Sequence, residues 1–426
     1  MASGARNYAI VTAAYWGFTL TDGALRMLVL LHFFHLGYSP FVLSFLFLLY
    51  EAAGIAANFI GGWLATRFGI TRMLTVGLST QITGFLVLSA LSPDWAAALS
   101  VVWVVAAQGI CGIAKDLTKT ASKSAIKVAE REARAEHAEG RLVQWVAWFT
   151  GSKNAMKGFG FFLGGLLLQT LGFRFSLWVM AAALAIILTG VVLSLPPMMG
   201  KSKASSSAKE LLGKSRGVNL LAAARIALFG ARDVWFVVGV PVFLYANGWT
   251  FTMVGGFMAL WTIFYGLIQA SAPAVIRRSA DGLTREVPAA RLWSALLASI
   301  PALIIVALEF DLGMRPDILL VIGLGLFGAA FAINSSVHSY LILAYAGSEK
   351  AAEDVGFYYA ANAAGRFAGT LLSGVLYQWG GITACLAGSA LMLVACFLTT
   401  LALPLSKQDE LKESRTSASP ARPSQQ

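Results

Sequence analysis

Charged residues are scarce in this chain. Asp, Glu, Lys and Arg make up 12% of its 426 residues, whereas 58% of the residues are hydrophobic and the mean hydropathy is +0.71. A soluble globular domain carries about 25% charged residues, so this composition excludes that class. Apolar windows long enough to cross a bilayer recur from end to end. The composition therefore predicts an all-α polytopic membrane protein.

Cysteine is also scarce, and its spacing excludes two kinds of site. The chain has three cysteines, Cys111, Cys385 and Cys396. The last two are separated by about 16 Å along a helix, so no disulfide framework or thiolate metal site is predicted. No span carries a nucleophile and base constellation or a metal-ligand spacing. We therefore expect neither an enzyme nor a cofactor.

Charge clusters and Pro/Gly turns divide the apolar sequence into about twelve predicted spans. They cover residues 8–34, 41–65, 73–91, 96–117, 142–170, 174–195, 219–245, 252–275, 292–310, 317–345, 355–379 and 383–404. No short apolar region with a cleavage site follows Met1, so the first span is expected to act as its own insertion signal.

The positions of the basic residues predict the orientation in the membrane. Most of the 32 Lys and Arg residues lie in the termini and in loops near 66–72, 115–141, 201–216, 277–291 and 350, whereas only Arg174 and Arg315 lie in loops on the other side. The positive-inside rule then places the N- and C-termini in the cytoplasm. The net charge of +11 reflects this topology and a surface near lipid headgroups, so no nucleic-acid partner is expected.

The two halves of the chain repeat each other. At an offset of 211 residues, Asp22 and Gly37 in the first half match Asp233 and Gly248 in the second. At an offset of 209 residues, five positions of the first half have matching residues in the second. They are Lys157, Gly160, Gly165, Gln169 and Gly172, which match Arg366, Gly369, Gly374, Gln378 and Gly381 in that order. The repeats predict two six-helix bundles, residues 1–199 and 218–404. A polar cytoplasmic linker at 200–217 and a disordered tail at 405–426 complete the predicted organisation.

Parallel six-span repeats are typical of the major facilitator superfamily, and a short segment strengthens this resemblance. Residues 62–72, GWLATRFGITR, resemble the superfamily's loop signature G-x-L-a-D-R-x-G-r-k-x after the second span, with Gly62, Arg67, Gly69 and Arg72 at the gating-loop positions. Thr66 replaces the usual acid, which leaves the gating lock in question. Residues 160–165, GFFLGG, resemble an antiporter motif with Phe161 in place of proline; plain helix packing is the alternative interpretation.

Two lysines lie in the middle of an apolar stretch at 142–171. A charge at the centre of a membrane helix costs about 2.5–3.5 kcal/mol, and the four-residue spacing places Lys153 and Lys157 on one helix face. Lys157 and Arg366 also occupy equivalent positions in the two repeats. Basic groups on opposite walls predict a site for a multiply charged anion, and arginine offers a bidentate fork to phosphate or arsenate.

Other ionisable and polar residues fall on the spans that the superfamily fold places around a central cavity. Asp22 and Arg26 are spaced to neutralise each other, whereas the adjacent Arg232 and Asp233 are expected to point in different directions. Contacts between the bundles, Asp22 with Arg232 or Arg26 with Asp233, stay open, as does the choice between structural and functional roles. The predicted substrate-binding set is Lys153, Lys157, Arg366, Arg26, Arg232, Asn154, Asn362 and His338; the predicted proton-coupling or charge-pair set is Asp22, Glu51 and Asp233.

Four stretches, residues 7–40, 112–127, 151–165 and 229–244, resemble the ArsJ-type organoarsenical efflux permeases. The resemblance implies a prokaryotic inner-membrane protein that exports 1-arseno-3-phosphoglycerate, which glyceraldehyde-3-phosphate dehydrogenase forms when arsenate replaces phosphate. That enzyme would be a functional partner, and hydrolysis after export would give arsenate resistance. Transport or antiport of another phosphorylated or organic anion remains an alternative. The repeats argue against a non-transporting receptor or a channel.

Overall fold

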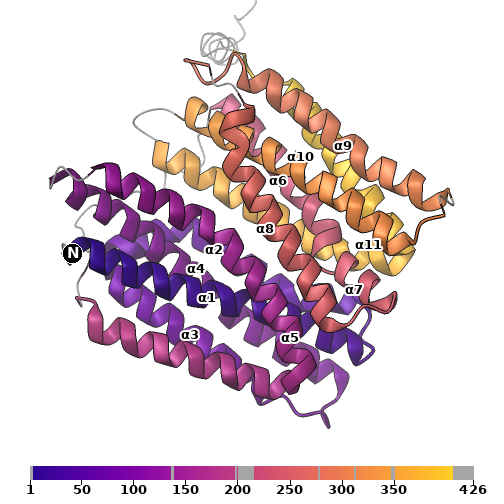
Figure 1. Ribbon diagram of the computed structural model, residues 1–426, viewed down its shortest axis with the longest axis horizontal. Helices are drawn as coiled ribbons and strands as arrows, with labels where there is room; N and C mark the ends of the chain where they lie inside the picture. The colour runs from indigo at the N-terminus through magenta and orange to yellow at the C-terminus, as the bar shows by residue number, and fades with distance from the viewer. Residues whose placement is uncertain are drawn as a thin grey trace, which may run out of the picture.

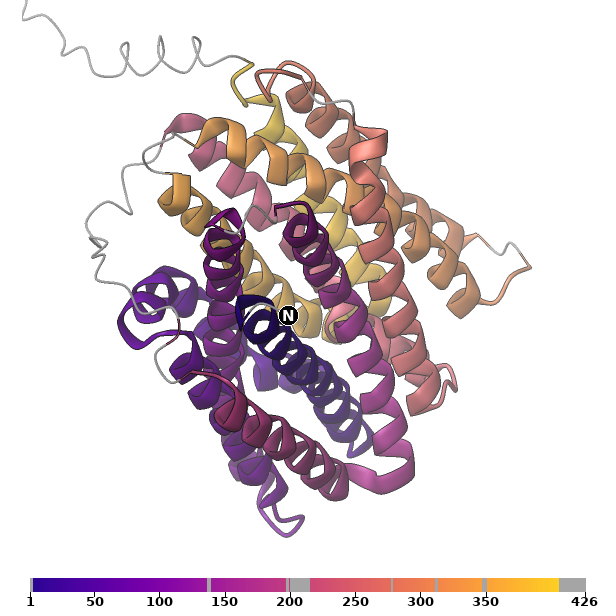
Figure 2. The same ribbon diagram turned by 60° about the vertical axis from the view of Figure 1, so that its left-hand side comes forward.

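The structure is a computed structural model, and every regular element in the residues it describes is a helix. It describes residues 3–135, 139–196, 199, 215–276, 279–310, 313–346 and 351–405. Within these ranges only the backbone is described at residues 3–5, 57–66, 126–135, 139–151, 351–353 and 355. The helices are α1 (Ser3–His35), α2 (Pro40–Phe68), α3 (Ile70–Ser89), α4 (Ala97–Ala135), α5 (Glu139–Ser194), α6 (Arg216–Phe236), α7 (Gly239–Ala246), α8 (Phe251–Val275), α9 (Glu286–Glu309), α10 (Pro316–Tyr345) and α11 (Ala351–Leu401). The helices before residue 196 lie beside those after residue 215 in both views (Figures 1 and 2).

Two of the helices each contain two spans, because a glycine turns the chain back. Gly172 in α5 has φ 72°, and Gly381 in α11 has φ 61°, a backbone region that favours glycine. After the first turn, Arg174 donates to the Leu91 carbonyl at 3.0 Å, whereas at the far end Thr71 donates to the Pro196 carbonyl at 2.7 Å. The two arms of α5 therefore run antiparallel (Figure 1).

The seventh span is broken between α6 and α7, which the sequence did not predict. The hydroxyl of Ser373 accepts hydrogen bonds from the backbone N–H groups of Val238 and Gly239, both at 3.1 Å. This side chain satisfies donors that an unbroken helix would satisfy itself. Counting α6 and α7 as one span and each arm of α5 and α11 as one, the described helices correspond to the twelve predicted spans.

Eight helical segments within the described residues are long and apolar enough to cross a membrane. The predicted end of the fourth span was too early: α4 continues from residue 117 to Ala135, because a helix need not end where its apolar stretch does. The seventh span begins at Arg216, ahead of the predicted 219. Residues 200–214 of the predicted linker and 406–426 of the predicted tail lie outside the described residues.

Equivalent glycines pack the two halves in the same way. Gly160 of α5 contacts the α1 backbone at Leu20 and Gly23, and its counterpart Gly369 of α11 contacts the α6 backbone at Gly230. At neither glycine is there room for a Cβ atom, so small residues permit these close crossings. The contacts of Gly160 agree with the packing interpretation of the 160–165 motif.

The contacts between the halves follow the same symmetry. Gly165 of α5 lies against the Phe251 carbonyl of α8, and its counterpart Gly374 of α11 lies against the Pro40 carbonyl of α2. Residues 40 and 251 are themselves related by the offset of 211. The halves are therefore joined by two equivalent helix pairs, α5 with α8 and α2 with α11, which flank the centre of the molecule.

Candidate functional site

A chain of ion pairs crosses between the halves at the α2 and α11 pair. Glu51 of α2 is 1% exposed and binds two arginines, Arg26 of α1 and Arg366 of α11, the second at 2.7 Å from Nη2 to Oε1. The Nε of Arg366 lies 3.5 Å from Oδ2 of Asp233 on α6. One carboxylate thus joins two basic side chains of the predicted substrate-binding set, one from each half. Arg366 is partnered in this structure.

Two expectations about neighbouring charges were wrong. Arg232 and Asp233 do not point apart: the Nε of Arg232 donates to Oδ1 of Asp233 at 2.6 Å, because a long arginine side chain can fold back onto its neighbour. The spacing of Asp22 and Arg26 does not lead to an ion pair either. Arg26 binds Glu51, and Asp22 accepts a hydrogen bond from the Tyr50 hydroxyl at 2.5 Å, so partners on α2 replace the partner within α1.

The two contacts left open between the bundles do not form. Among the described residues, Asp22 makes no ion pair with Arg232, and Arg26 makes none with Asp233. Glu51 with Arg366 is the pair that crosses between the halves.

Lys153 and Lys157 are the cations of the predicted set that have no acidic partner among the described residues. Within the residues that the structure describes, neither lysine forms a hydrogen bond or an ion pair; Lys157 lies with Nζ 5.5 Å from the centre of the Phe161 ring. The charges of Arg366, Arg26 and Arg232 act on Lys157, opposed by Asp22. Those of Lys119, Arg366 and Lys115 act on Lys153. Both lysines thus belong to one net-positive region.

The repeat explains why Arg366 has an acidic partner and Lys157 does not. The offsets of 209 and 211 relate the pair Arg366 and Glu51 to the pair Lys157 and Thr262. The Thr262 hydroxyl donates to the Met258 carbonyl of its own helix at 2.8 Å. The two halves are therefore symmetric in backbone packing at this point but asymmetric in charge.

Thr262 belongs to the stripe of α8 that packs on α5. On that stripe, Gly255 lies against Phe161, Ala259 against Gly158, and Gly266 against Asn154. Residue 262 falls between the last two at helical spacing, so it is on the α5 side of α8. The position equivalent to Glu51 therefore lies at the interface between α5 and α8, but it carries no carboxylate.

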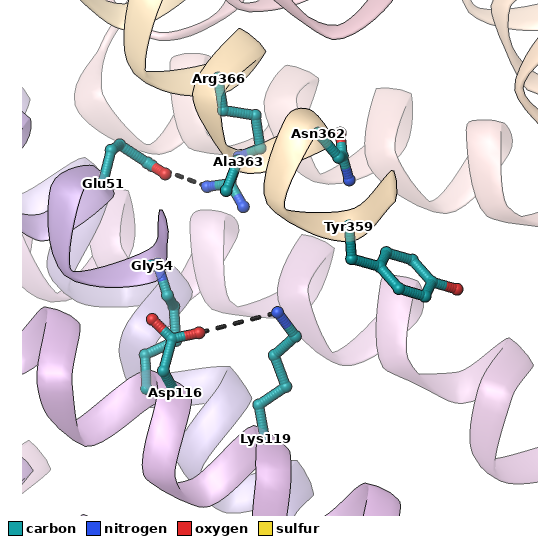
Figure 3. A pocket seen from close by; sticks show the side chains of 9 residues that line it. Glu51, Gly54, Asp116, Lys119, Tyr359, Asn362, Ala363 and Arg366 are labelled. Carbon is teal, nitrogen blue, oxygen red and sulfur yellow. Dashed lines mark hydrogen bonds and ion pairs between the residues drawn. The ribbon is translucent and has the colours of Figure 1, made fainter. Parts of the chain in front are cut away.

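A small pocket adjoins the ion pairs between α2, α4 and α11 (Figure 3). Lys115 lies 3.7 Å from the centre of the Tyr50 ring, and Lys119 lies 3.6 Å from Asp116. The cavity holds about 30 Å³, enough for one or two waters but not for an organic anion. Binding of a larger ligand here requires the walls to move apart. The pocket is lined by Glu51, Gly54, Lys115, Asp116, Lys119, Tyr359, Asn362, Ala363 and Arg366.

Lys115, Asp116, Lys119 and Tyr359 line the pocket but are not among the site residues predicted from the sequence. The four-residue spacing of Lys115, Lys119 and Lys123 was the available signal, because it places all three on one face of α4. Nothing in the sequence alone brings Tyr359 to that face; in the structure its ring lies 4.4 Å from Nζ of Lys123.

The predicted polar residues occupy three different places. Asn154 donates to Gln269 of α8 at 3.3 Å, so it joins the halves. Asn362 lines the pocket and its Oδ1 has no partner among the described residues. His338 is fully buried beside Arg225 and does not line the pocket.

The predicted gating-loop residues lie at the turn between α2 and α3. Gly69 has φ 79° and precedes α3, and the N–H of Ile70 donates to the Met199 carbonyl at 2.8 Å. Arg67 and Arg72 are exposed. Gly62 lies in α2, where only the backbone is described.

The opposite end of the molecule is closed between the halves. His35 Nδ1 and the Tyr245 hydroxyl are 2.8 Å apart, and Gln169 accepts hydrogen bonds from the backbone N–H and the hydroxyl of Thr252, at 3.1 and 2.7 Å. With the contacts of Gly165 and Gly374, these bonds seal the end that carries few basic residues.

Searches of family models and of curated proteins found no match for this chain. Solved structures do match over nearly the full length. The nucleoside transporter NupG superposes with a TM-score of 0.70 at 14% identity, covering 93% of this chain and 98% of that one. A POT family transporter in complex with 5-aminolevulinic acid superposes with a TM-score of 0.69 at 13% identity, and the match covers 94% of this chain and 96% of that one.

A D-xylose–proton symporter gives a TM-score of 0.63 at 15% identity, covering 93% of this chain and 97% of that one. At such identities the likeness establishes the fold and not the substrate. These three solved proteins are transporters, and their shared architecture is the one that the internal repeats predict. This chain has the fold of the major facilitator superfamily.

Proposed function

We propose that this chain is a secondary transporter that exports 1-arseno-3-phosphoglycerate from the cytoplasm across a prokaryotic inner membrane and so confers arsenate resistance. Glyceraldehyde-3-phosphate dehydrogenase is the enzyme proposed to form this substrate, as the resemblance to the organoarsenical permeases implies. The observation that carries the proposal is the pair of central lysines, Lys153 and Lys157, which have no acidic partner among the described residues.

Unpaired lysines favour an anionic substrate because burying their charges without a counter-charge costs free energy when the site is empty. A charge inside a membrane protein is expensive unless a counter-charge or water compensates it. Here Glu51 is bound by two arginines and Asp233 by Arg232, whereas Asp22 accepts a hydrogen bond from the neutral Tyr50 hydroxyl and leaves one negative charge for two lysines. A ligand with two or more negative charges would supply the missing compensation for both lysines.

The ion pair between Glu51 and Arg366 gives the proposed site a way to respond to its ligand. An arsenate or phosphate group bound to Lys157 would lie near Arg366, whose charge already acts on that lysine. It would then compete with the Glu51 carboxylate for the guanidinium, which binds either group bidentately. Because Glu51 and Arg366 belong to different halves, this exchange would loosen one of the two helix pairs that join them.

Alternating access in this proposal uses the two equivalent helix pairs as the moving interface. The small cavity at the centre cannot hold the substrate until α2 and α11 separate. The proposed gating residues Gly62, Arg67, Gly69 and Arg72 lie towards the basic end of the same helix, α2, or at the start of α3. Separation at that end, with the opposite end closed, would open the site to the cytoplasm.

The test is arsenic uptake into everted membrane vesicles that contain the protein. One sample receives arsenate alone, and the other receives arsenate with glyceraldehyde 3-phosphate, NAD and the dehydrogenase. Accumulation only in the complete mixture supports the proposal. Accumulation from arsenate alone, or none in either sample with inserted protein, contradicts it; competition by other phosphorylated anions would then identify the alternative substrate.

The site is tested by Lys157→Gln and Arg366→Gln, with Arg285→Gln as the matched control. Arg285 is an exposed basic residue in the turn before α9. We expect both central variants to lose uptake and arsenate resistance at normal membrane levels, and the control to retain them. Normal transport by both central variants would refute the assigned site without refuting the fold.

A further inference from the structure

A second group of buried polar residues lies in the C-terminal half, outside the pocket and its ion pairs. It contains Arg225 of α6, Ser335 and His338 of α10, and Tyr358 of α11; their exposed fractions are 4%, 0%, 0% and 1%. Arg225 donates to the Ser335 carbonyl at 3.1 Å, and its guanidinium lies 4.8 Å from the centre of the Tyr358 ring. The charge of Arg225 also acts on His338. Three helices thus bring these side chains together.

Arg225 has no counter-charge in the part of the chain that the structure describes. Its guanidinium makes no ion pair, and its other close neighbour is the Phe229 ring at 4.1 Å. A carbonyl and two aromatic faces stabilise a buried cation only in part. The same ring lies 4.9 Å from Arg232, whose own ion-pair partner is Asp233.

The unsatisfied atoms around Arg225 belong to four side chains, each of which can donate a hydrogen bond. They are Nε of Arg225, the ring nitrogens of His338, and the hydroxyls of Ser335 and Tyr358, none with a hydrogen-bond partner among the described residues. A neutral imidazole carries one N–H, and each hydroxyl carries one O–H. The Tyr358 hydroxyl lies close to the Ser339 side chain, whose hydroxyl donates to the Ser335 carbonyl at 2.9 Å. Buried donors without acceptors are rare, and each costs free energy.

From this arrangement we propose that Arg225, Ser335, His338 and Tyr358 form a second site, which binds a small inorganic anion of the chloride class. A single anion would accept hydrogen bonds from several donors and supply the counter-charge that Arg225 lacks. Water would satisfy the donors but not the charge. This proposal does not depend on the proposed function, because the site lies apart from the unpaired lysines.

The site assigns His338 a role different from the one that its sequence position suggested. His338 was expected to line the substrate cavity; in the structure it is enclosed with Arg225. The bound anion would hold α6, α10 and α11 together. We therefore expect it to stabilise the C-terminal half.

The experiment measures the thermal unfolding of the purified full chain in detergent. Sodium chloride replaces sodium gluconate at constant ionic strength, so that only the anion changes. Ligand that binds the native state alone raises the unfolding temperature in proportion to ln(1 + [L]/Kd). We expect the unfolding temperature to rise with chloride according to this relation, and saturable equilibrium binding of radioactive chloride with the same Kd.

Three variants make the result specific. Tyr358→Phe removes one donor and is expected to raise the Kd for chloride about tenfold, the effect of one hydrogen bond of about 1.4 kcal/mol. Arg225→Met is expected to abolish the chloride effect. Tyr377→Phe is the matched control, because Tyr377 lies on the same helix about 28 Å from Tyr358 along the axis, and it should match the wild type.

Each outcome decides the proposal. Equal unfolding temperatures of the wild type in chloride and gluconate overturn it, and so does an unchanged Kd for chloride in Tyr358→Phe. An equal chloride effect in all variants indicates a general salt effect and overturns it as well. If Arg225→Met does not fold, the comparison of Tyr358→Phe with Tyr377→Phe decides. None of these results alters the vesicle test of export.

Discussion

Thr262→Glu is the most direct test of the charge asymmetry. This substitution places a carboxylate at the position equivalent to Glu51, on the side of α8 that packs against α5. Glu51 binds Arg366 at 2.7 Å across the corresponding helix pair. We therefore expect the new carboxylate to bind Lys157 in the same way. The substrate must then displace it.

The size of the effect follows from the interaction that the substrate loses. A hydrogen bond to a charged group contributes about 1.5–3 kcal/mol, which corresponds to roughly 10- to 100-fold in affinity. We expect the KM for uptake into everted vesicles to rise by that factor. Thr262→Gln is the control, since glutamine has nearly the same size as glutamate but no charge. Its KM is expected to change less than about threefold, because only the bond to the Met258 carbonyl is lost.

The comparison of the two variants decides the argument. A KM raised equally by Thr262→Glu and Thr262→Gln would mean that side-chain volume at the interface, and not the charge on Lys157, limits binding. An unchanged KM in Thr262→Glu would mean that Lys157 does not contact the substrate. Either result would refute the reasoning from asymmetry. Membrane levels of all variants are measured by immunoblot so that loss of protein is not mistaken for loss of affinity.

Two further predictions concern the interface between the halves. Glu51→Gln removes the carboxylate that Arg26 and Arg366 share, and breaking a buried ion pair costs about 3–5 kcal/mol. We therefore expect this variant to have a lower unfolding temperature in detergent than the wild type. The control Glu309→Gln, near the end of α9, should leave the unfolding temperature unchanged. Gly165→Val leaves no room for the Phe251 carbonyl and is expected to open the sealed end, so that a cysteine introduced at Ser44, a fully buried position beside Gly374, reacts several-fold faster with an impermeant maleimide. The three native cysteines are buried, and Gly190→Val, a position with no neighbour within 4 Å, is the control. Equal labelling of the two valine variants would contradict the assignment of the seal.

The local sequence was sufficient to predict the membrane-spanning segments and the fold. Apolar windows and charge clusters located the membrane helices, because the bilayer imposes length and composition on each span separately. The repeated glycines, such as Gly160 and Gly369, predicted two related halves, and both glycines pack against a helix backbone at equivalent crossings. The break between α6 and α7 was not predictable in this way, since the hydroxyl that supports it comes from Ser373 on α11.

Pairing of the charges required the tertiary structure. The sequence identified Asp22, Arg26, Glu51, Asp233 and Arg366 as charges within spans, and spacing along one helix suggested a pair that does not form. The partner of each group comes from another helix, and helical periodicity describes one helix at a time. For the same reason the sequence could not bring Tyr359 to the pocket or His338 to Arg225.

By itself the sequence determined that this chain spans a membrane many times, that its halves are related, and that cations lie near its centre, because hydropathy, repeats and composition are properties of residues in order along the chain. Only the tertiary structure decided which of those cations are neutralised. Glu51 reaches Arg366 across the α2 and α11 pair, whereas Thr262, the residue equivalent to Glu51, donates to the Met258 carbonyl of its own helix. An ion pair depends on distances of a few ångströms between side chains of different helices, and packing alone sets those distances.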